Sequence, residues 1–147
     1  MPTAAKLFAA FGFAFMAFFA SESFVFELPE GTDPGWFSYI NTAIGAICGW
    51  RVMGKLAGDG YYSAMTSGLR TLAVFMFFAL GGHCLAEMIR LATKLRYDGP
   101  GDAIMGMFAM ILDYGFLIVT SVPVMLILFV GSVLAAWFSE WASHRWN

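Results

Sequence analysis

Two aspartates could give this chain its chemistry, because they lie in an otherwise apolar stretch. Asp113 is the only charged residue between Ala103 and Phe138. An ionisable group in a membrane segment is a candidate for proton or cation handling. Asp102 falls on the same helix face, within about 40° of one line at about 100° per residue. The plainer alternative is an acid at the water boundary of an interfacial helix, since a transporter should show more than one such group.

A second candidate group precedes this stretch. His83, Glu87 and Arg90 are spaced by four and three residues, so they share one face of a helix. A histidine beside a carboxylate can bind a metal or a tetrapyrrole, which makes His83 the one candidate for cofactor binding. One histidine and one carboxylate are too few ligands for a metal site, however. A local pair of His83 with a neighbouring side chain at the membrane interface is the plainer interpretation. We therefore expect neither a metal site nor a resident cofactor.

The remaining residue types predict no catalytic site. Cys48 and Cys84 lie in apolar segments without CxxC spacing, which is typical of small apolar filler. The chain contains no Walker sequence, no HExxH and no GxSxG motif. We expect a protein that is not an enzyme and has no catalytic residues.

The composition is that of an integral membrane protein. Of 147 residues, 60% are hydrophobic and only 12% are charged, against about 25% in soluble domains. Each transmembrane helix needs roughly 20 apolar residues, so residues 1–147 form a single membrane domain with about four spans. The ten acids and eight bases are dispersed in the connections, which argues against a nucleic-acid partner. Membrane lipids are the expected surroundings.

The predicted fold is an all-α polytopic bundle with transmembrane helices over about 4–26, 36–53, 64–89 and 122–141. A straight helix from Ala103 to Phe138 would be about 54 Å long, far more than the roughly 30 Å of hydrocarbon. The run must therefore break. Ser or Thr can cap a helix start and proline fits its first turn, so Thr120 to Pro123 is the expected break. The thin polar stripe before it predicts an interfacial or re-entrant amphipathic helix over about 102–120.

Small residues predict where helices pack closely. Gly45 and Gly49 form a GxxxG pair, and Asn41 lies one turn earlier on the same face. Ala10 and Ala14 belong to a small-residue face of the first span. Such faces fit another helix of the bundle, other integral membrane subunits or self-association.

Basic residues predict a cytoplasmic N-terminus. If Ala103 to Phe138 makes a single crossing, five bases lie inside and three outside. Two crossings would divide them evenly. The outer bases are Arg90, Lys94 and Arg96.

Several motifs together resemble one family. The opening MPTAAKL, the block PEGTDPGWFSYINTAIGAICGWRVMGK followed by AGDGY, the later RYDGP and the closing EWASHRW are similar to the TrgA family of small alphaproteobacterial inner-membrane proteins. The resemblance implies a multi-pass protein of the bacterial cytoplasmic membrane, associated with tellurite resistance and without an established catalytic site. That family often has several acids after RYDGP. Here Asp102 and Asp113 alone mark that face, which leaves room for a true crossing.

Three functions follow from these observations. The expected one is a non-enzymatic inner-membrane protein with a role in oxyanion tolerance or envelope stress. The alternative is an accessory structural subunit of a larger bacterial membrane complex, either photosynthetic (reaction centre or light-harvesting) or respiratory. A small transporter or channel using Asp113 is the third.

Overall fold

The regular structure of the described residues is entirely helical. The computed structural model describes residues 3–28 and 35–146. Its helices are α1 (Thr3–Glu27), α2 (Phe37–Cys48), the π-helix η1 (Gly49–Met53), α3 (Gly54–Leu56), α4 (Tyr61–Thr93), α5 (Pro100–Thr120) and α6 (Val122–Arg145). The predicted all-α helical bundle is thereby confirmed.

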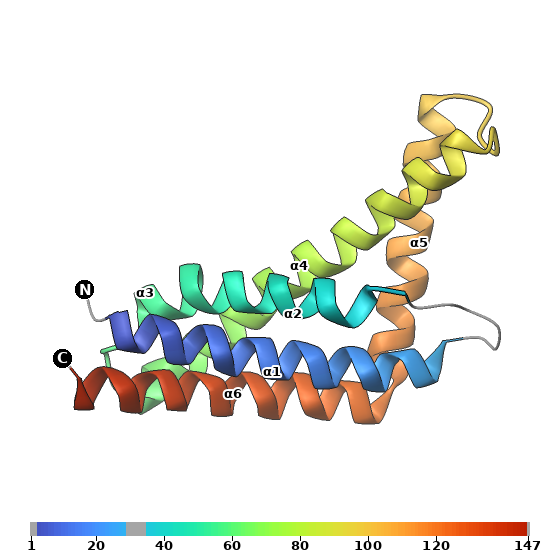
Figure 1. The fold of residues 1–147 in the computed structure, drawn as a ribbon. Helices are drawn as coiled ribbons and strands as arrows, with labels where there is room; N and C mark the ends of the chain where they lie inside the picture. Colours follow the sequence, from blue (N-terminus) through green and yellow to red (C-terminus); the bar gives the residue numbers. More distant parts are fainter. Residues whose placement is uncertain (1–2, 29–34, 147) are drawn as a thin grey trace.

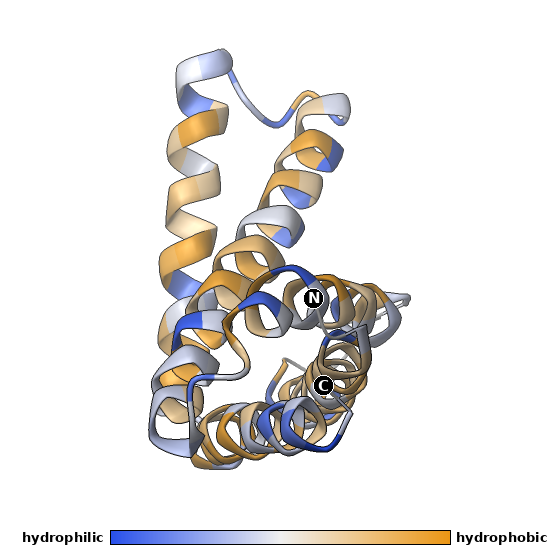
Figure 2. Cartoon of the chain, turned by 90° about the vertical axis from the view of Figure 1, so that its left-hand side faces the viewer, coloured by the Kyte–Doolittle hydropathy of each residue, from blue (hydrophilic) through white to orange (hydrophobic). Residues whose placement is uncertain are grey.

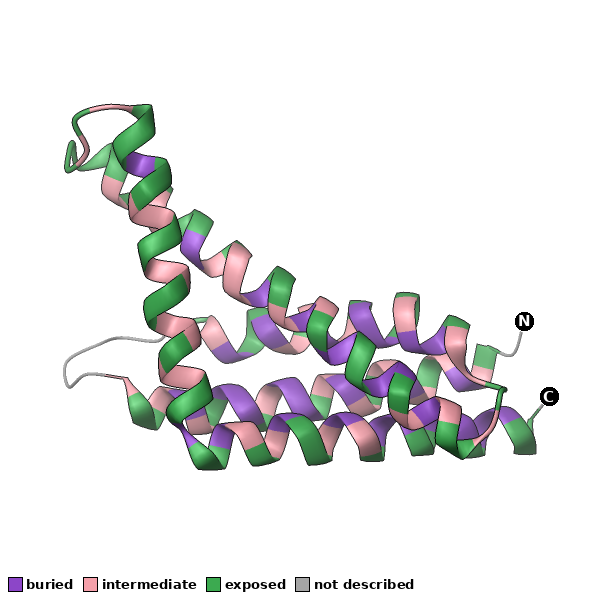
Figure 3. Ribbon diagram, turned by 180° about the vertical axis from the view of Figure 1, so that it is seen from behind, coloured by how far each residue is buried: buried purple, intermediate pink, exposed green. Residues whose placement is uncertain are grey.

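The helices form a bundle with α5 crossing one end. Because α2, η1 and α3 follow one another directly, they make one rod over residues 37–56, called here the α2–α3 rod. This rod, α1 and α6 run side by side, while α4 leans away from them (Figure 1). The described ends of the chain lie at one end of the bundle, the terminal end. At the opposite, far end, α5 runs across the direction of α1 and α6 (Figures 1 and 3).

Four helices, α1, α4, α5 and α6, are long and apolar enough to cross a membrane, by length and composition. Apolar residues colour much of every helix in Figure 2. The α2–α3 rod falls outside this set because its longest regular α-helical piece has 12 residues. The crosswise direction of α5 is that of an interfacial or re-entrant helix, although its length would allow a crossing. Its placement in the membrane stays a prediction, as does a crossing by residues 36–53.

Glycines let the α2–α3 rod pack directly on the backbone of α1. A Cβ atom added at Gly45 would lie 2.6 Å from the carbonyl oxygen of Phe13. One added at Gly49 would collide with the carbonyl oxygen of Ala9 and lie 3.0 Å from the Cα of Ala10. The GxxxG pair and Ala10 therefore meet at one helix contact within this chain, in the manner of small-residue contacts between membrane helices.

The other side of α1 approaches α6 in the same way. A Cβ at Gly12 would lie 2.8 Å from the Cβ of Ala135, and one at Gly131 would lie 2.7 Å from the Cγ of Met16. Ala14 of α1 is half-buried. Two close contacts on different sides make α1 the central helix of the bundle.

Helix α4 is close to α6 only near its own start. A Cβ at Gly68 would lie 2.7 Å from the Cβ of Ala136 and 2.8 Å from the carbonyl oxygen of Ser132. A Cβ at Gly81 or Gly82 would meet nothing within 4 Å. The later part of α4 is therefore free to diverge toward α5.

The break between α5 and α6 lies where the sequence predicts it, but neither Thr120 nor Ser121 caps α6 with its side chain. Ser121 is the N-cap residue of α6, and Pro123 lies in the first turn. The Ser121 side chain makes no capping hydrogen bond, and its buried hydroxyl has no partner among the described residues. The Thr120 hydroxyl instead donates to the carbonyl oxygen of Phe116, 2.8 Å away. Neither hydroxyl therefore caps α6.

Helix α5 has three different faces. Ala103 and Tyr114 lie on the side that packs toward the bundle, while Asp102 and Asp113 lie on an exposed flank. The remaining face is apolar and exposed, as at Met105 (74%). The acid stripe is therefore turned outward and not against the bundle.

Gly49→Ala tests the contact between the α2–α3 rod and α1. The added methyl group must push against the backbone of Ala9, and such overpacking typically costs about 1–3 kcal/mol. We expect a lower unfolding temperature in detergent micelles. The matched control is Gly81→Ala, where the added Cβ meets open space and alanine favours the helix. Equal unfolding temperatures for Gly49→Ala and the unaltered protein would contradict the contact.

Reporter fusions test the crosswise placement of α5. If α1, the α2–α3 rod, α4 and α6 each cross the membrane and α5 does not, the N- and C-termini face the same compartment. Green fluorescent protein fluoresces in the bacterial cytoplasm but not when it is exported unfolded. We expect it to be bright at either terminus. A dark C-terminal fusion combined with active alkaline phosphatase at the same position would contradict this set of crossings.

Candidate functional site

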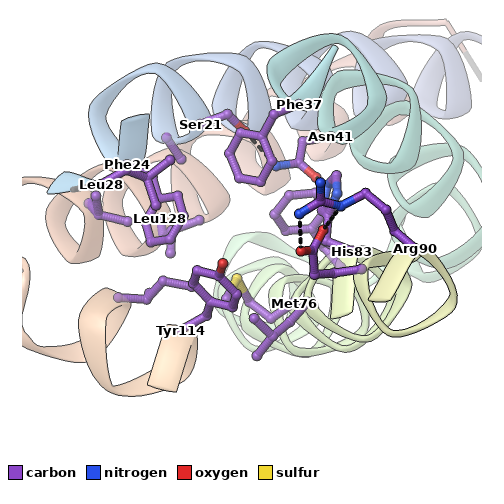
Figure 4. A pocket seen from close by; sticks show the side chains of 17 residues that line it. Ser21, Phe24, Leu28, Phe37, Asn41, Met76, His83, Arg90, Tyr114 and Leu128 are labelled. Carbon is purple, nitrogen blue, oxygen red and sulfur yellow. Dashed lines mark hydrogen bonds and ion pairs between the residues drawn. The ribbon is translucent and has the colours of Figure 1, made fainter. Parts of the chain in front are cut away.

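A cavity of about 680 Å³ with both polar and apolar walls lies at the far end of the bundle. Helices α1, α2, α4, α5 and α6 all contribute to its wall (Figure 4). Its size lies within the range of small-molecule sites, about 300–1,000 Å³, which are mostly apolar with a few convergent polar groups. The cavity is therefore the candidate binding site.

A chain of hydrogen bonds crosses one wall of this cavity. The side-chain amide of Asn41 donates to the Ser21 hydroxyl at 2.8 Å, and its Oδ1 is 2.7 Å from Nε2 of His83. Because an amide oxygen only accepts, His83 Nε2 must carry the hydrogen of that bond. The imidazole also packs on Phe37, with ring centroids 4.6 Å apart. These contacts tie α1, α2 and α4 together.

Glu87 and Arg90 form an ion pair beside this chain. The Arg90 Nε donates to Glu87 Oε2 at 2.8 Å, and Nη2 donates to Oε1. The guanidinium thus satisfies both carboxylate oxygens, so the pair contributes little net charge to the cavity. His83 does not join it, although the sequence places all three on one helix face. Among the described residues, no three His, Cys, Asp or Glu side chains come together as a metal site would require.

An apolar groove of about 340 Å³ adjoins the cavity. Its walls come from α4, α5 and α6, and its lining side chains are all apolar. Met76, Ile118 and Leu128 line both spaces, so the groove and the cavity share a wall. A chamber with polar groups in its wall and a neighbouring apolar groove match the two ends of an amphiphilic molecule.

The other sequence candidates lie away from this chamber. Asp102 and Asp113 are exposed on the flank of α5. Cys48 and Cys84 are buried free thiols. Of the candidates, Asn41, His83, Glu87 and Arg90 line the cavity.

Tyr114 is a cavity residue that the sequence reasoning did not select. Its ring meets Phe24 edge-on at 6.3 Å, and its side chain projects toward the chamber in Figure 4. The available signal was its place on the helix face opposite the exposed apolar side chains of α5, one position after Asp113. Asp113 was selected as the ionisable group of this segment, whereas the adjacent Tyr114 was not.

Glu140, also not selected from the sequence, organises the terminal end. Its carboxylate is fully buried and accepts the backbone N–H groups of Gly58 and Gly60, each at 2.7 Å. His144 Nε2 lies 2.9 Å from the same carboxylate. A buried acid with this set of donors anchors the turn before α4 to α6. The signal in the sequence was an acid four residues before a histidine, which alone predicts only a surface pair.

Glu140→Gln tests this anchor. An amide offers one acceptor oxygen, so its NH₂ group would face a glycine N–H and leave that partly buried donor unpaired, at a cost of up to about 1–3 kcal/mol. We expect a lower unfolding temperature in detergent. Glu27→Gln is the control, because Glu27 is exposed on the end of α1. Equal losses for the two variants would refute a special role for Glu140.

Comparison with known proteins adds no family to this geometry. No protein-family model matches the chain, and neither the characterised proteins nor the solved structures gave a match. The resemblance to TrgA proteins stays a prediction based on the quoted motifs. The candidate site therefore rests on the cavity and the residues that surround it.

Proposed function

We propose that this protein is a non-enzymatic integral protein of the bacterial cytoplasmic membrane that binds a neutral amphiphile in the far-end cavity. In that role it contributes to oxyanion tolerance or envelope stress. The observation that supports binding is the cavity itself, with the Ser21–Asn41–His83 chain in its wall and an apolar groove beside it. The role in oxyanion tolerance or envelope stress is inferred from the resemblance to the TrgA family.

The wall chemistry favours binding over catalysis. The side-chain amide of Asn41 is hydrogen-bonded through its nitrogen to Ser21 and through its oxygen to His83. Polar groups held in this way are positioned to orient a ligand. Activation of a nucleophile would instead need a base in contact with a reactive hydroxyl or thiol.

The same chemistry argues against direct binding of an oxyanion. Arg90 is the cation of the cavity wall, and Glu87 already occupies it through two hydrogen bonds. An anion would have to share the Arg90 guanidinium with that carboxylate, whose negative charge opposes it. We therefore propose that a contribution to tellurite tolerance is indirect and acts through the bound amphiphile.

Filling the cavity tests this function. Ala79 is buried and lines the chamber, so Ala79→Phe should exclude a ligand, whereas Ala86→Phe places the same ring on an exposed position of α4. We expect mass spectrometry of the purified protein to find a neutral amphiphile that is lost only from Ala79→Phe. A strain carrying that variant should be as sensitive to tellurite and envelope stress as a deletion strain.

Two results would overturn the proposal. One is that purified protein of unchanged thermal stability carries the same lipids with and without Ala79→Phe. The other is that the deletion strain tolerates tellurite and envelope stress as well as its parent.

An accessory role in a photosynthetic or respiratory complex is the second candidate. Its support is the exposed apolar face of α5, where Met105, Leu112 and Phe116 are each more than 70% exposed. A protein subunit in constant proportion during the same purification would favour this role. A transporter using Asp113 has less support, since that carboxylate lies on the outer flank of α5 while its neighbour Tyr114 lines the cavity.

A further inference from the structure

The amphiphile can be described more closely, on the basis of the proposed function. The chamber presents no uncompensated charge, because its ion pair is closed and Ser21 and Asn41 are neutral. A charged lipid headgroup would therefore find no unpaired opposite charge in this wall. A neutral polar end fits the chamber better.

The chamber favours a planar ring. Phe24 and Phe37 are stacked with centroids 5.6 Å apart, and Phe37 continues to His83 at 4.6 Å. Tyr114 meets Phe24 edge-on, with ring centroids 6.3 Å apart. Aromatic walls of this kind stack on flat rings, whereas a flexible alkyl chain gains only contact area from them.

Hydrogen-bonding groups define what that ring should carry. Since His83 Nε2 donates to Asn41, the neutral imidazole keeps Nδ1 as an acceptor, and this nitrogen has no partner among the described residues. Tyr114 supplies a hydroxyl that both donates and accepts. A ring with a hydroxyl donor toward His83 and a second oxygen toward Tyr114 would satisfy both groups.

The adjoining groove accounts for the rest of the molecule. It lies beyond Met76, Ile118 and Leu128, which line both spaces, and its lining side chains are apolar. An unbranched or isoprenoid chain attached to the ring would lie there. We propose that the far-end cavity binds a quinol with a long apolar tail, with the hydroquinone ring in the chamber and the tail passing Met76, Ile118 and Leu128 into the groove.

Thermal unfolding of the detergent-solubilised full chain tests this proposal, since a ligand that binds the folded protein raises its unfolding temperature with concentration. The probes are decylubiquinol kept reduced under argon, decylubiquinone and dodecanol. We expect saturable stabilisation by the quinol and roughly fivefold weaker binding of the quinone, which cannot donate to His83. Tyr114→Phe should weaken quinol binding by a similar factor, while the exposed Tyr39→Phe should not.

Each of the remaining outcomes would overturn a different part of the proposal. Stabilisation by dodecanol equal to that by the quinol would overturn ring recognition and leave amphiphile binding in place. Equal affinities for quinol and quinone, or an unchanged affinity in Tyr114→Phe, would overturn the assigned contacts. If no probe stabilises the protein, the quinol is excluded, and the lipid analysis of Ala79→Phe decides separately whether the cavity binds an amphiphile at all.

Discussion

Close approach of α1 to two neighbouring backbones is the constraint on which the rest of this structure depends. In a membrane there is no hydrophobic driving force between helices, so tight packing must come from van der Waals contact. Gly45 and Gly49 allow it on one side of α1, and Gly12 and Gly131 allow it on the other. With three rods held this closely, little freedom remains in their relative positions.

The cavity exists because the fourth long helix does not follow this pattern to its end. Contact at Gly68 holds the start of α4 against α6, but Gly81 and Gly82 meet no neighbour. The far part of α4 leans outward, and α5 returns across the gap (Figure 1). Hydrogen bonds from Ser21 through Asn41 to His83 then span a separation that direct packing does not close. The cavity and the hydrogen-bonded polar groups in its wall thus have one origin.

Sequence reasoning could reach the parts of this arrangement that are local. Glycine spacing identified the face of Gly45 and Gly49, and Pro123 marked the break before α6. The pairing of His83 with Asn41 joins residues 42 positions apart, so no helical periodicity could reveal it. Tyr114 was missed for a related reason, because its role depends on where α5 crosses the bundle. Glu140 looked like an ordinary charge near a helix end, since its two backbone donors lie far away in the chain.

The long sequence separation of the Glu140 contacts has a consequence for how the protein is made. Its carboxylate pairs with backbone groups 82 and 80 positions earlier. The turn at Gly58 to Gly60 is therefore synthesised well before its acceptor exists, and those amides must bond to water until α6 arrives. The turn between α3 and α4 is thus among the last parts of the chain to form its final hydrogen bonds. Insertion of the final helix completes the structure of a turn that lies near the middle of the chain.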